Sequence, residues 1–311
     1  MSKLKYKYLI CIVFMAVALF LCVYALGCGL SDKDAILLSK NFCKKMGVYI
    51  STEPMVLGSR YDHFNLSSKS KELVVRPRGT IEASFDISCK DKEITRFDNH
   101  KLRDQVFREY NISLDNRKKR NWPKLLPENK AKEIVFIHAN NINLPEDVIF
   151  SHMSLDKTYN GAWIGHWKRV HNGYLYENDS LSVAIMAING EFYSYAKHFL
   201  GKPCSTDVKI PKDRAIEVSR GKVSDLLRGD MAKKHLQDFV VTSSELKIIQ
   251  PNTIFGFLTP FHSTDSRLAW VVTYSLPSND LKLAEEVNFS DKFVIKVDAA
   301  TGKVIGGDFS R

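Results

Sequence analysis

Two Asn-Gly pairs, Asn172-Gly173 and Asn189-Gly190, constrain the fold of this chain most strongly. They separate three stretches of alternating apolar and polar residues: 162–170, 180–188 and 191–195. An Asn-Gly pair between alternating stretches favours a two-residue β-hairpin turn, because Asn and Gly tolerate the positive φ that such a turn needs. The sequence therefore predicts antiparallel sheet in the middle of the chain.

A helix followed by paired strands recurs on either side of this region. In the first such unit, Ser31 caps a predicted helix and Gly47 ends it. Predicted strands at 79–88 and 93–97 follow, joined by a turn at residues 89–92. In the second unit, a helix over 127–139, with Pro127 at its start, precedes the two hairpins.

The third unit opens with an amphipathic helix over 213–227, and a second helical stretch covers 231–239. Its predicted strands are 245–249, 268–274, 292–298 and 303–306. We therefore expect an α+β protein with units at 31–116, 127–202 and 203–311. A basic linker at 117–126, which contains Arg117-Lys118-Lys119-Arg120, separates the first two units.

The leader, residues 1–30, contains an uncharged run of 22 residues, 9–30, that follows Lys3, Lys5 and Lys7. About 20 apolar residues in a helix cross a bilayer, and flanking lysines favour the cytoplasmic side. The length favours an uncleaved signal anchor. Two alternatives stay open: a lipoprotein leader acylated at Cys28, since Ala25-Leu26-Gly27-Cys28 resembles a lipobox, and a cleaved secretory signal. All three place residues 31–311 outside the cytoplasm, at the cell membrane or secreted.

Composition excludes a disordered chain, because 44% of the residues are hydrophobic and 26% are charged. The formal net charge of +10 favours anionic surfaces, but no nucleic-acid-binding motif is present, and we expect no nucleic-acid partner. Of six cysteines, only Cys43, Cys89 and Cys204 follow the leader. A Cys43–Cys89 disulfide is one of the pairings that the sequence leaves open.

The C-terminal third resembles the PepSY domain, a module of peptidase propeptides and bacterial envelope proteins. The resemblance is carried by residues 212–216 (KDRAI), 268–272 (LAWVV) and 293–305 (FVIKVDAATGKVI), the last of which fills the V-D-A-x-T-G-x-V pattern of the family. The second unit, with Trp163, Trp167, Arg169 and Gly173, resembles a related segment, and the first unit is a weaker relative. The resemblance implies a helix packed across an antiparallel sheet, no shared catalytic residues, and binding or inhibition of peptidases.

No sequence motif of a metalloprotease, a serine hydrolase or a phosphate-binding loop occurs. We expect no catalytic residue, no cofactor and no metal. His166 and His171 lie five residues apart across a strand and a turn, which disfavours joint metal ligation. Trp163, Trp167 and Trp270 are the candidate aromatic residues for binding a partner, although aromatic residues on strands also serve as core.

These observations predict a membrane-tethered, extracytoplasmic protein without enzymatic activity that binds another polypeptide, such as an envelope peptidase, at sheet edges or an aromatic face. An envelope hydrolase with an unfamiliar site is the alternative, and it requires His166, His171 or His262 beside carboxylates in one pocket. A second alternative is a structural spacer without an unprotected sheet edge.

Overall fold

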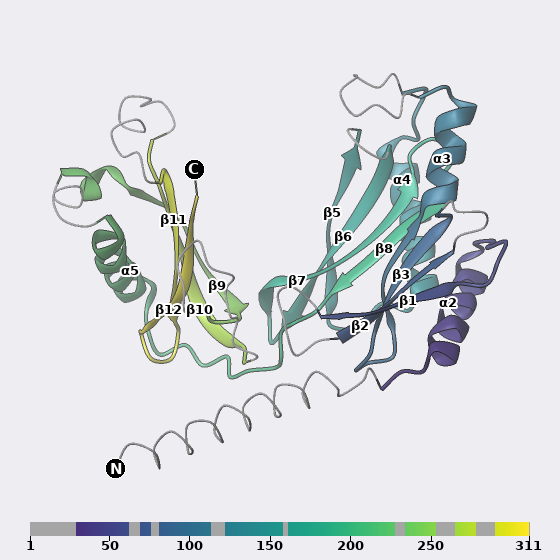
Figure 1. Ribbon diagram of the computed structural model, residues 1–311. Helices are drawn as coiled ribbons and strands as arrows, with labels where there is room; N and C mark the ends of the chain where they lie inside the picture. Colours follow the sequence, from purple (N-terminus) through teal and green to yellow (C-terminus); the bar gives the residue numbers. More distant parts are fainter. Residues whose placement is uncertain are drawn as a thin grey trace, which may run out of the picture.

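The computed structural model describes residues 29–61, 69–75, 81–112, 122–157, 161–227, 234–252, 265–277 and 290–310. Within them the chain forms two antiparallel sheets that are joined by one parallel bridge and flanked by helices. Figure 1 shows the N-terminal sheet on the right and the C-terminal sheet on the left. The predicted α+β class is confirmed.

The N-terminal sheet has the strand order β1-β2-β3-β4-β8-β7-β6-β5, and the C-terminal sheet has the order β9-β10-β11-β12. The N-terminal elements are α2 (Asp32–Met46), β1 (Met55–Tyr61), β2 (Lys69–Val75), β3 (Ala83–Ser88), β4 (Ile94–Asn99), α3 (His100–Glu109), α4 (Glu128–Ile142), β5 (Val148–Asp156), β6 (Ala162–His171), β7 (Tyr174–Met186) and β8 (Phe192–His198). The C-terminal elements are α5 (Lys212–Leu227), a 3₁₀ turn (Leu236–Asp238), β9 (Val240–Ile249), β10 (Arg267–Ser275), β11 (Lys292–Asp298) and β12 (Val304–Ser310).

One face of the N-terminal sheet packs against α2 and α4. Phe85, Phe97, Tyr195 and Val183 form a row of paired residues across four strands, and all four are buried in this core. Because alternate strand residues point to the same face, this row is the inner face of the sheet. Three fully buried small or β-branched residues of α4 (Ala131, Val135 and Ala139) lie one helical turn apart and face the sheet.

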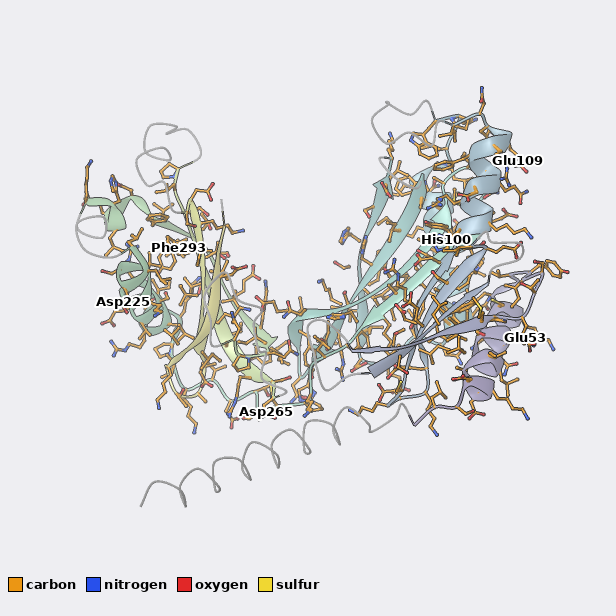
Figure 2. All side chains as sticks on the ribbon, in the orientation of Figure 1. Glu53, His100, Glu109, Asp225, Asp265 and Phe293 are labelled. Carbon is orange, nitrogen blue, oxygen red and sulfur yellow. The ribbon has the colours of Figure 1, made fainter. Side chains whose placement is uncertain are left out.

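The opposite face of the same sheet is covered in part by α3, whose ends His100 and Glu109 are labelled in Figure 2. Leu102, Val106 and Phe107 of this helix pack with Ala184 and Tyr193. Ala184 lies next to Val183 in the chain and therefore points to the other side of the sheet. The part of this outer face that α3 does not cover carries mostly polar and small side chains.

The first two predicted units share a single sheet. Strand β4 of the first unit pairs with β8 of the second, with Arg96, Phe97 and Asp98 opposite Ala196, Tyr195 and Ser194. The helices of both units contribute to one hydrophobic core. The chain therefore builds one eight-stranded layer from two sequence segments that each resemble a smaller unit.

In the C-terminal sheet, α5 lies across strands β10, β11 and β12. Ala215, Ser219, Val223 and Leu227 form its buried face. The Ser219 hydroxyl lies 2.8 Å from the Tyr274 hydroxyl, which also donates to the Ile216 carbonyl oxygen at 2.9 Å. Phe293, labelled in Figure 2, is fully buried in this core. This is the helix-across-sheet arrangement that the sequence resemblance implies.

The turn between β11 and β12 explains the D-A-x-T-G pattern in physical terms. The Asp298 carboxylate accepts hydrogen bonds from the backbone N–H groups of Ala300 and Thr301 at 2.9 and 2.7 Å. Gly302 adopts a φ of 71°, which side chains with a Cβ disfavour. A short acidic side chain and a glycine at these positions therefore fix the turn.

The helices and hairpins predicted from the sequence are largely confirmed. Ser31 caps α2 through its side chain and Gly47 ends that helix at a φ of 68°. Asn172 and Gly173 both have positive φ, as the predicted two-residue turn requires. Of Asn189 and Gly190 only Gly190 has positive φ, and a longer connection, residues 187–191, joins β7 to β8. Predicted strands 268–274 and 292–298 pair as β10 and β11. Of the second predicted helix in the third unit (231–239), residues 236–238 form a 3₁₀ turn and residues 231–233 lie outside the described residues.

Four elements were not predicted: β1, β2, α3 and β5. Residues 1–28 of the leader and residues 117–121 of the basic linker lie outside the described residues, whereas Trp122 and Leu126 of that linker pack against the cores of the N-terminal sheet. Leu30, the last residue of the apolar run, is only 2% exposed and packs in the N-terminal core, so the folded part includes it. Among the helices that the structure describes, none is long and apolar enough to span a membrane.

Candidate functional site

Strand β5 forms one edge of the N-terminal sheet, and among the described strands it pairs only with β6. Figure 1 shows it at the margin of the sheet on the side of the C-terminal unit. The nine residues of β5 contain no lysine, arginine or proline. Such residues, or an edge covered by other chain, normally prevent a free edge strand from pairing with another molecule.

The inner side of β5 is held firmly to the core by aromatic residues. The Phe150 ring lies 5.0 Å from the Phe136 ring of α4 and 5.4 Å from the Trp167 ring of β6, measured between centroids. The Lys132 ammonium of α4 lies 4.7 Å from the centroid of Phe150. The strand is thus anchored along its inner face while its outer edge is left open.

A β-bulge interrupts β5 between Phe150 and His152, so that Ser151 has no partner of its own in β6. The residues that pack on the core are consequently Val148, Phe150 and Met153, with a spacing of two and then three. Because of this irregular spacing, the sequence of β5 lacks the strict alternation of apolar and polar residues by which a strand is recognised. It explains why β5 was not predicted.

The outer face beside β5 is polar. His152 pairs with His166 of β6, which pairs with Ser182 of β7, and that residue pairs with Ala196 of β8. Lys168 lies two residues further along β6 and pairs with Ser180. On this part of the face β7 and β8 carry small side chains, whereas β5 and β6 carry the larger ones: Ile149, the two imidazole groups and Lys168.

The two imidazole rings stack, with centroids 4.5 Å apart and planes inclined by 16°. Nε2 of His166 lies 2.8 Å from the Ser154 hydroxyl, and Nδ1 of His152 lies 3.1 Å from the Ser151 hydroxyl. Burial lowers the pKa of His166 from its ordinary value of 6.5, and the neighbouring His152 and Lys168 lower that pKa further. His166 therefore carries a neutral imidazole at pH 7.

Strand β12, an edge strand of the C-terminal sheet, contrasts with β5. Asn252 donates a hydrogen bond to the Gly307 carbonyl oxygen at 2.7 Å and accepts one from the Gly307 N–H at 3.0 Å. The Asn252 N–H also donates to the carbonyl oxygen of Ile305. The fold thus occupies main-chain groups of β12 at Ile305 and Gly307, whereas no hydrogen bond to the outer side of β5 occurs among the described residues.

A second polar cluster fixes the connection between the two sheets. Arg169 of β6 bonds the Asp147 carboxylate at 2.6 Å, the Asp179 carboxylate at 3.1 Å and the Gly201 carbonyl oxygen at 2.7 Å. Asp179 is fully buried, and its carboxylate also accepts from the N–H groups of Leu200 and Gly201. This cluster orients the chain where it leaves β8 toward the C-terminal unit.

The sheets themselves meet at Tyr176 of β7, which pairs in parallel with Ile248 of β9. The Lys296 ammonium of β11 forms an ion pair with Glu177, the next residue of β7. The Tyr176 ring is buried, and the Arg169 guanidinium carbon lies 4.7 Å from the centroid of this ring. Burial raises the pKa of the Tyr176 hydroxyl. The junction therefore contains a hydrophobic contact as well as an ion pair.

Of the three tryptophans that the sequence suggested as partner-binding residues, Trp163 and Trp167 lie in the N-terminal core and Trp270 in the C-terminal core. The prediction is wrong for Trp167, because its ring is only 2% exposed and belongs to the N-terminal core. Trp163 and Trp270 are half-buried, and their indole N–H groups donate to the carbonyl oxygens of Leu126 and Ile210 at 2.9 and 2.8 Å. They lie in different cores, so the three rings form no common surface.

The histidines of the hydrolase alternative are not brought together with carboxylates among the described residues. His166 faces His152 and Ser154, His171 lies at the end of β6, and His262 is outside the described residues. No group of three or more His, Cys, Asp or Glu side chains in the described part of the chain is arranged to hold a metal ion. Sequence reasoning missed His152, because it lies on the unrecognised strand β5.

The three cysteines that follow the leader differ in whether they form a disulfide. Cys89 is disulfide-bonded, whereas Cys43 and Cys204 are free, so the Cys43–Cys89 pairing does not form. Burial raises the pKa of the Cys43 thiol to about 12, which keeps it protonated and unreactive. Cys28, the candidate lipidation site, lies outside the described residues.

No family model and no curated protein matches this chain. Among solved structures, a similar one is the Bacillus megaterium YpeB C-terminal domain, with 12% sequence identity and a TM-score of 0.44. The match covers 91% of this chain and 99% of that chain. With so low an identity and TM-score, this similarity carries no argument about the function of the present chain.

Proposed function

We propose that this protein is a membrane-attached, extracytoplasmic binding protein without enzymatic activity. It binds an extended segment of another polypeptide by adding that segment as a strand to the edge of β5. The partner we propose is a secreted or envelope peptidase, which the protein holds or inhibits. The observation that carries the proposal is the open edge of β5, which other chain does not cover among the described residues.

Strand addition suits the chemistry of this edge. A segment paired with nine residues extends over about 30 Å and receives main-chain hydrogen bonds without a sequence motif on either side. Exposed side chains at the edge, among them Ile149, then determine which segments fit. The aromatic anchoring of Phe150 keeps the edge in place, so little ordering is needed when a partner binds.

The location rests on two observations. The uncharged run at 9–30 with preceding lysines is typical of a signal anchor or an export leader. The disulfide at Cys89 is of a kind that persists in oxidising compartments outside the cytoplasm. Both support the proposed extracytoplasmic location of residues 31–311.

The proposed class of partner rests on the PepSY resemblance of the third unit. Its support in the structure is α5 packed across β10, β11 and β12 of an antiparallel sheet, together with the Asp298 turn that the family pattern requires. Modules of this kind have no catalytic residues in common, and a binding role fits that feature. The edge of β5 then provides the place for the contact.

The test selects peptides that bind the full chain in detergent and measures their affinity for matched variants. Ile149→Lys places a charge on β5 at a side chain that is 49% exposed. Ile137→Lys makes the same change on α4 at a side chain that is 59% exposed, and serves as the control. We expect at least a tenfold loss of affinity for Ile149→Lys and no change for Ile137→Lys.

Two further measurements identify the mode of binding. N-methylation of alternate residues in a selected peptide should abolish its binding, because it removes donors of the ladder. Hydrogen exchange should show protection of the β5 amides when the peptide is present. Protection confined to other strands, or equal binding by both lysine variants, would reject strand addition at this edge.

A further inference from the structure

We propose that His152 and His166 together form a binding site for one divalent transition-metal ion, with Cu²⁺ preferred over Zn²⁺. The site goes beyond the proposed binding function and does not depend on it. It uses two neighbouring side chains on the exposed face of the β5–β6 pair. The two residues lie directly opposite each other in the register of these strands.

Position is the first argument. Directly paired residues on neighbouring antiparallel strands have Cβ atoms about 5 Å apart. The imidazole centroids are 4.5 Å apart, so the two rings are already in contact. The rings are stacked, so their lone pairs do not yet converge; His152 is exposed, and a change of its rotamer is what directs a nitrogen of each ring at one ion.

Protonation is the second argument. A metal ion binds a neutral imidazole through a lone pair, and the partly buried position of the His166 ring favours its uncharged form. Two protonated rings at this separation repel each other. One divalent ion between two neutral rings avoids that repulsion, because each ring contributes a lone pair and no charge.

The serines supply the third argument. Ser154 holds Nε2 of His166 at 2.8 Å, and Ser151 holds Nδ1 of His152 at 3.1 Å. Among the described residues no hydrogen bond reaches the other nitrogen of either ring, so each of these nitrogens is available as a ligand. Partners of this kind fix the tautomer and orientation of ligating histidines. The bulge at Ser151 is what places that hydroxyl beside His152.

The expected ion follows from the ligand set. Imidazole nitrogens suit copper, zinc and nickel, and divalent copper binds most tightly in this series. The described residues contribute no third His, Cys, Asp or Glu ligand, so water completes the coordination. Lys168 lies nearby on the same face and weakens the binding of a cation. The site should therefore exchange its ion readily.

The experiment titrates the untagged full chain in detergent with Cu²⁺ and with Zn²⁺ by calorimetry. Every protein carries Cys204→Ala, so that the half-buried free thiol does not bind the ion. Electron paramagnetic resonance of the Cu²⁺ complex counts the nitrogen ligands. We expect one ion per chain, a signal of two imidazole nitrogens, and weaker binding of Zn²⁺.

His152→Ala and His166→Ala should each weaken Cu²⁺ binding by at least about 10-fold, because losing a ligand costs no less than losing a hydrogen-bond partner of a ligand, and should leave at most one nitrogen in the spectrum. His171→Ala, on the same strand β6, is the matched control and should change neither measurement. Circular dichroism verifies that all variants are folded. Binding that survives the double variant His152→Ala/His166→Ala, or a wild-type spectrum without two nitrogens, overturns the proposal.

Discussion

Asp179 shows how much a single buried carboxylate can determine. Its side chain is fully buried, yet it accepts hydrogen bonds from two backbone N–H groups and from Arg169, whose side chain is 17% exposed. A charge in such a place is tolerated because all of its partners are in position. Removal of the carboxylate leaves the arginine without its buried counter-ion.

Asp179→Ala should therefore lower the free energy of unfolding by about 3 kcal/mol. Glu217→Ala is the control, since it breaks an ion pair with Arg214 whose side chains are 57% and 68% exposed, and it should change stability by less than about 0.5 kcal/mol. Urea unfolding followed by tryptophan fluorescence compares the two. Equal effects of both variants would contradict this account of the junction.

The cysteines give a second prediction at this scale. Peptide mapping of the membrane-extracted protein under non-reducing conditions should find Cys89 in a disulfide and Cys43 and Cys204 as free thiols. The remaining cysteines of the chain, Cys11, Cys22 and Cys28, lie in the leader. A free thiol at Cys89 would remove one of the two supports for the extracytoplasmic location, and a linked Cys28 would exclude its acylation.

Elements of this protein pack through small residues. The best example is the contact of α4 with β6, where an ideal Cβ on Gly165 would lie 2.6 Å from Cγ1 of Val135 and 3.0 Å from the Trp167 ring. Val135 and Trp167 are both buried, so neither can move away cheaply. Glycine at this position sets the distance between the helix and the sheet.

Gly165→Ala should accordingly destabilise the protein by about 1–3 kcal/mol through overpacking. Gly221→Ala is the matched substitution in α5, where nothing lies within 4 Å of the new Cβ, and it should stabilise by about 0.5–1 kcal/mol. Thermal or chemical unfolding of the two variants measures whether each substitution raises or lowers the free energy of unfolding. A neutral or stabilising Gly165→Ala would mean that α4 sits further from β6 than described.

At the scale of the whole molecule, three histidines among the described residues make the folded state less stable at acidic pH. Burial lowers the pKa of His100, His138 and His166 below the ordinary value of 6.5. Between the lowered values and 6.5, the unfolded chain binds more protons than the folded one, so stability is lost as the pH falls. Above pH 6.5 both states are neutral at these sites, and their contribution to stability is fully present.

The unfolding midpoint of the full chain should thus fall when the pH is lowered from 7.5 through 6.5 toward 5. His166→Gln should make this fall less steep, because it removes one of the three groups with a lowered pKa. Thermal scans at half-unit steps of pH measure the effect. A midpoint that stays constant over this range would show that the three rings are protonated as easily in the folded state as in the unfolded one.

The limits of sequence reasoning are visible in particular residues. Asn172-Gly173, Ser31, Gly47 and Asp298 revealed turns and helix ends because their side chains or φ values act within a few residues of the backbone. Strand β5 stayed hidden because the bulge at Ser151 breaks its alternation, and His152 was missed with it. Trp167 was misjudged because a strand tryptophan has the same local pattern whether it faces a core or a partner.

The sequence by itself determined the local elements of this protein: the capped helices, the Asn-Gly hairpins and the Asp-Gly-stabilised turn of the C-terminal unit. Only the tertiary structure decided that β4 pairs with β8, that β5 is an open edge, and that His152 faces His166. The physical reason is the distance along the chain over which each kind of interaction acts. Turn and cap preferences are properties of neighbouring residues, whereas strand order and edge position depend on how segments far apart in the chain compete for the same partners and the same core.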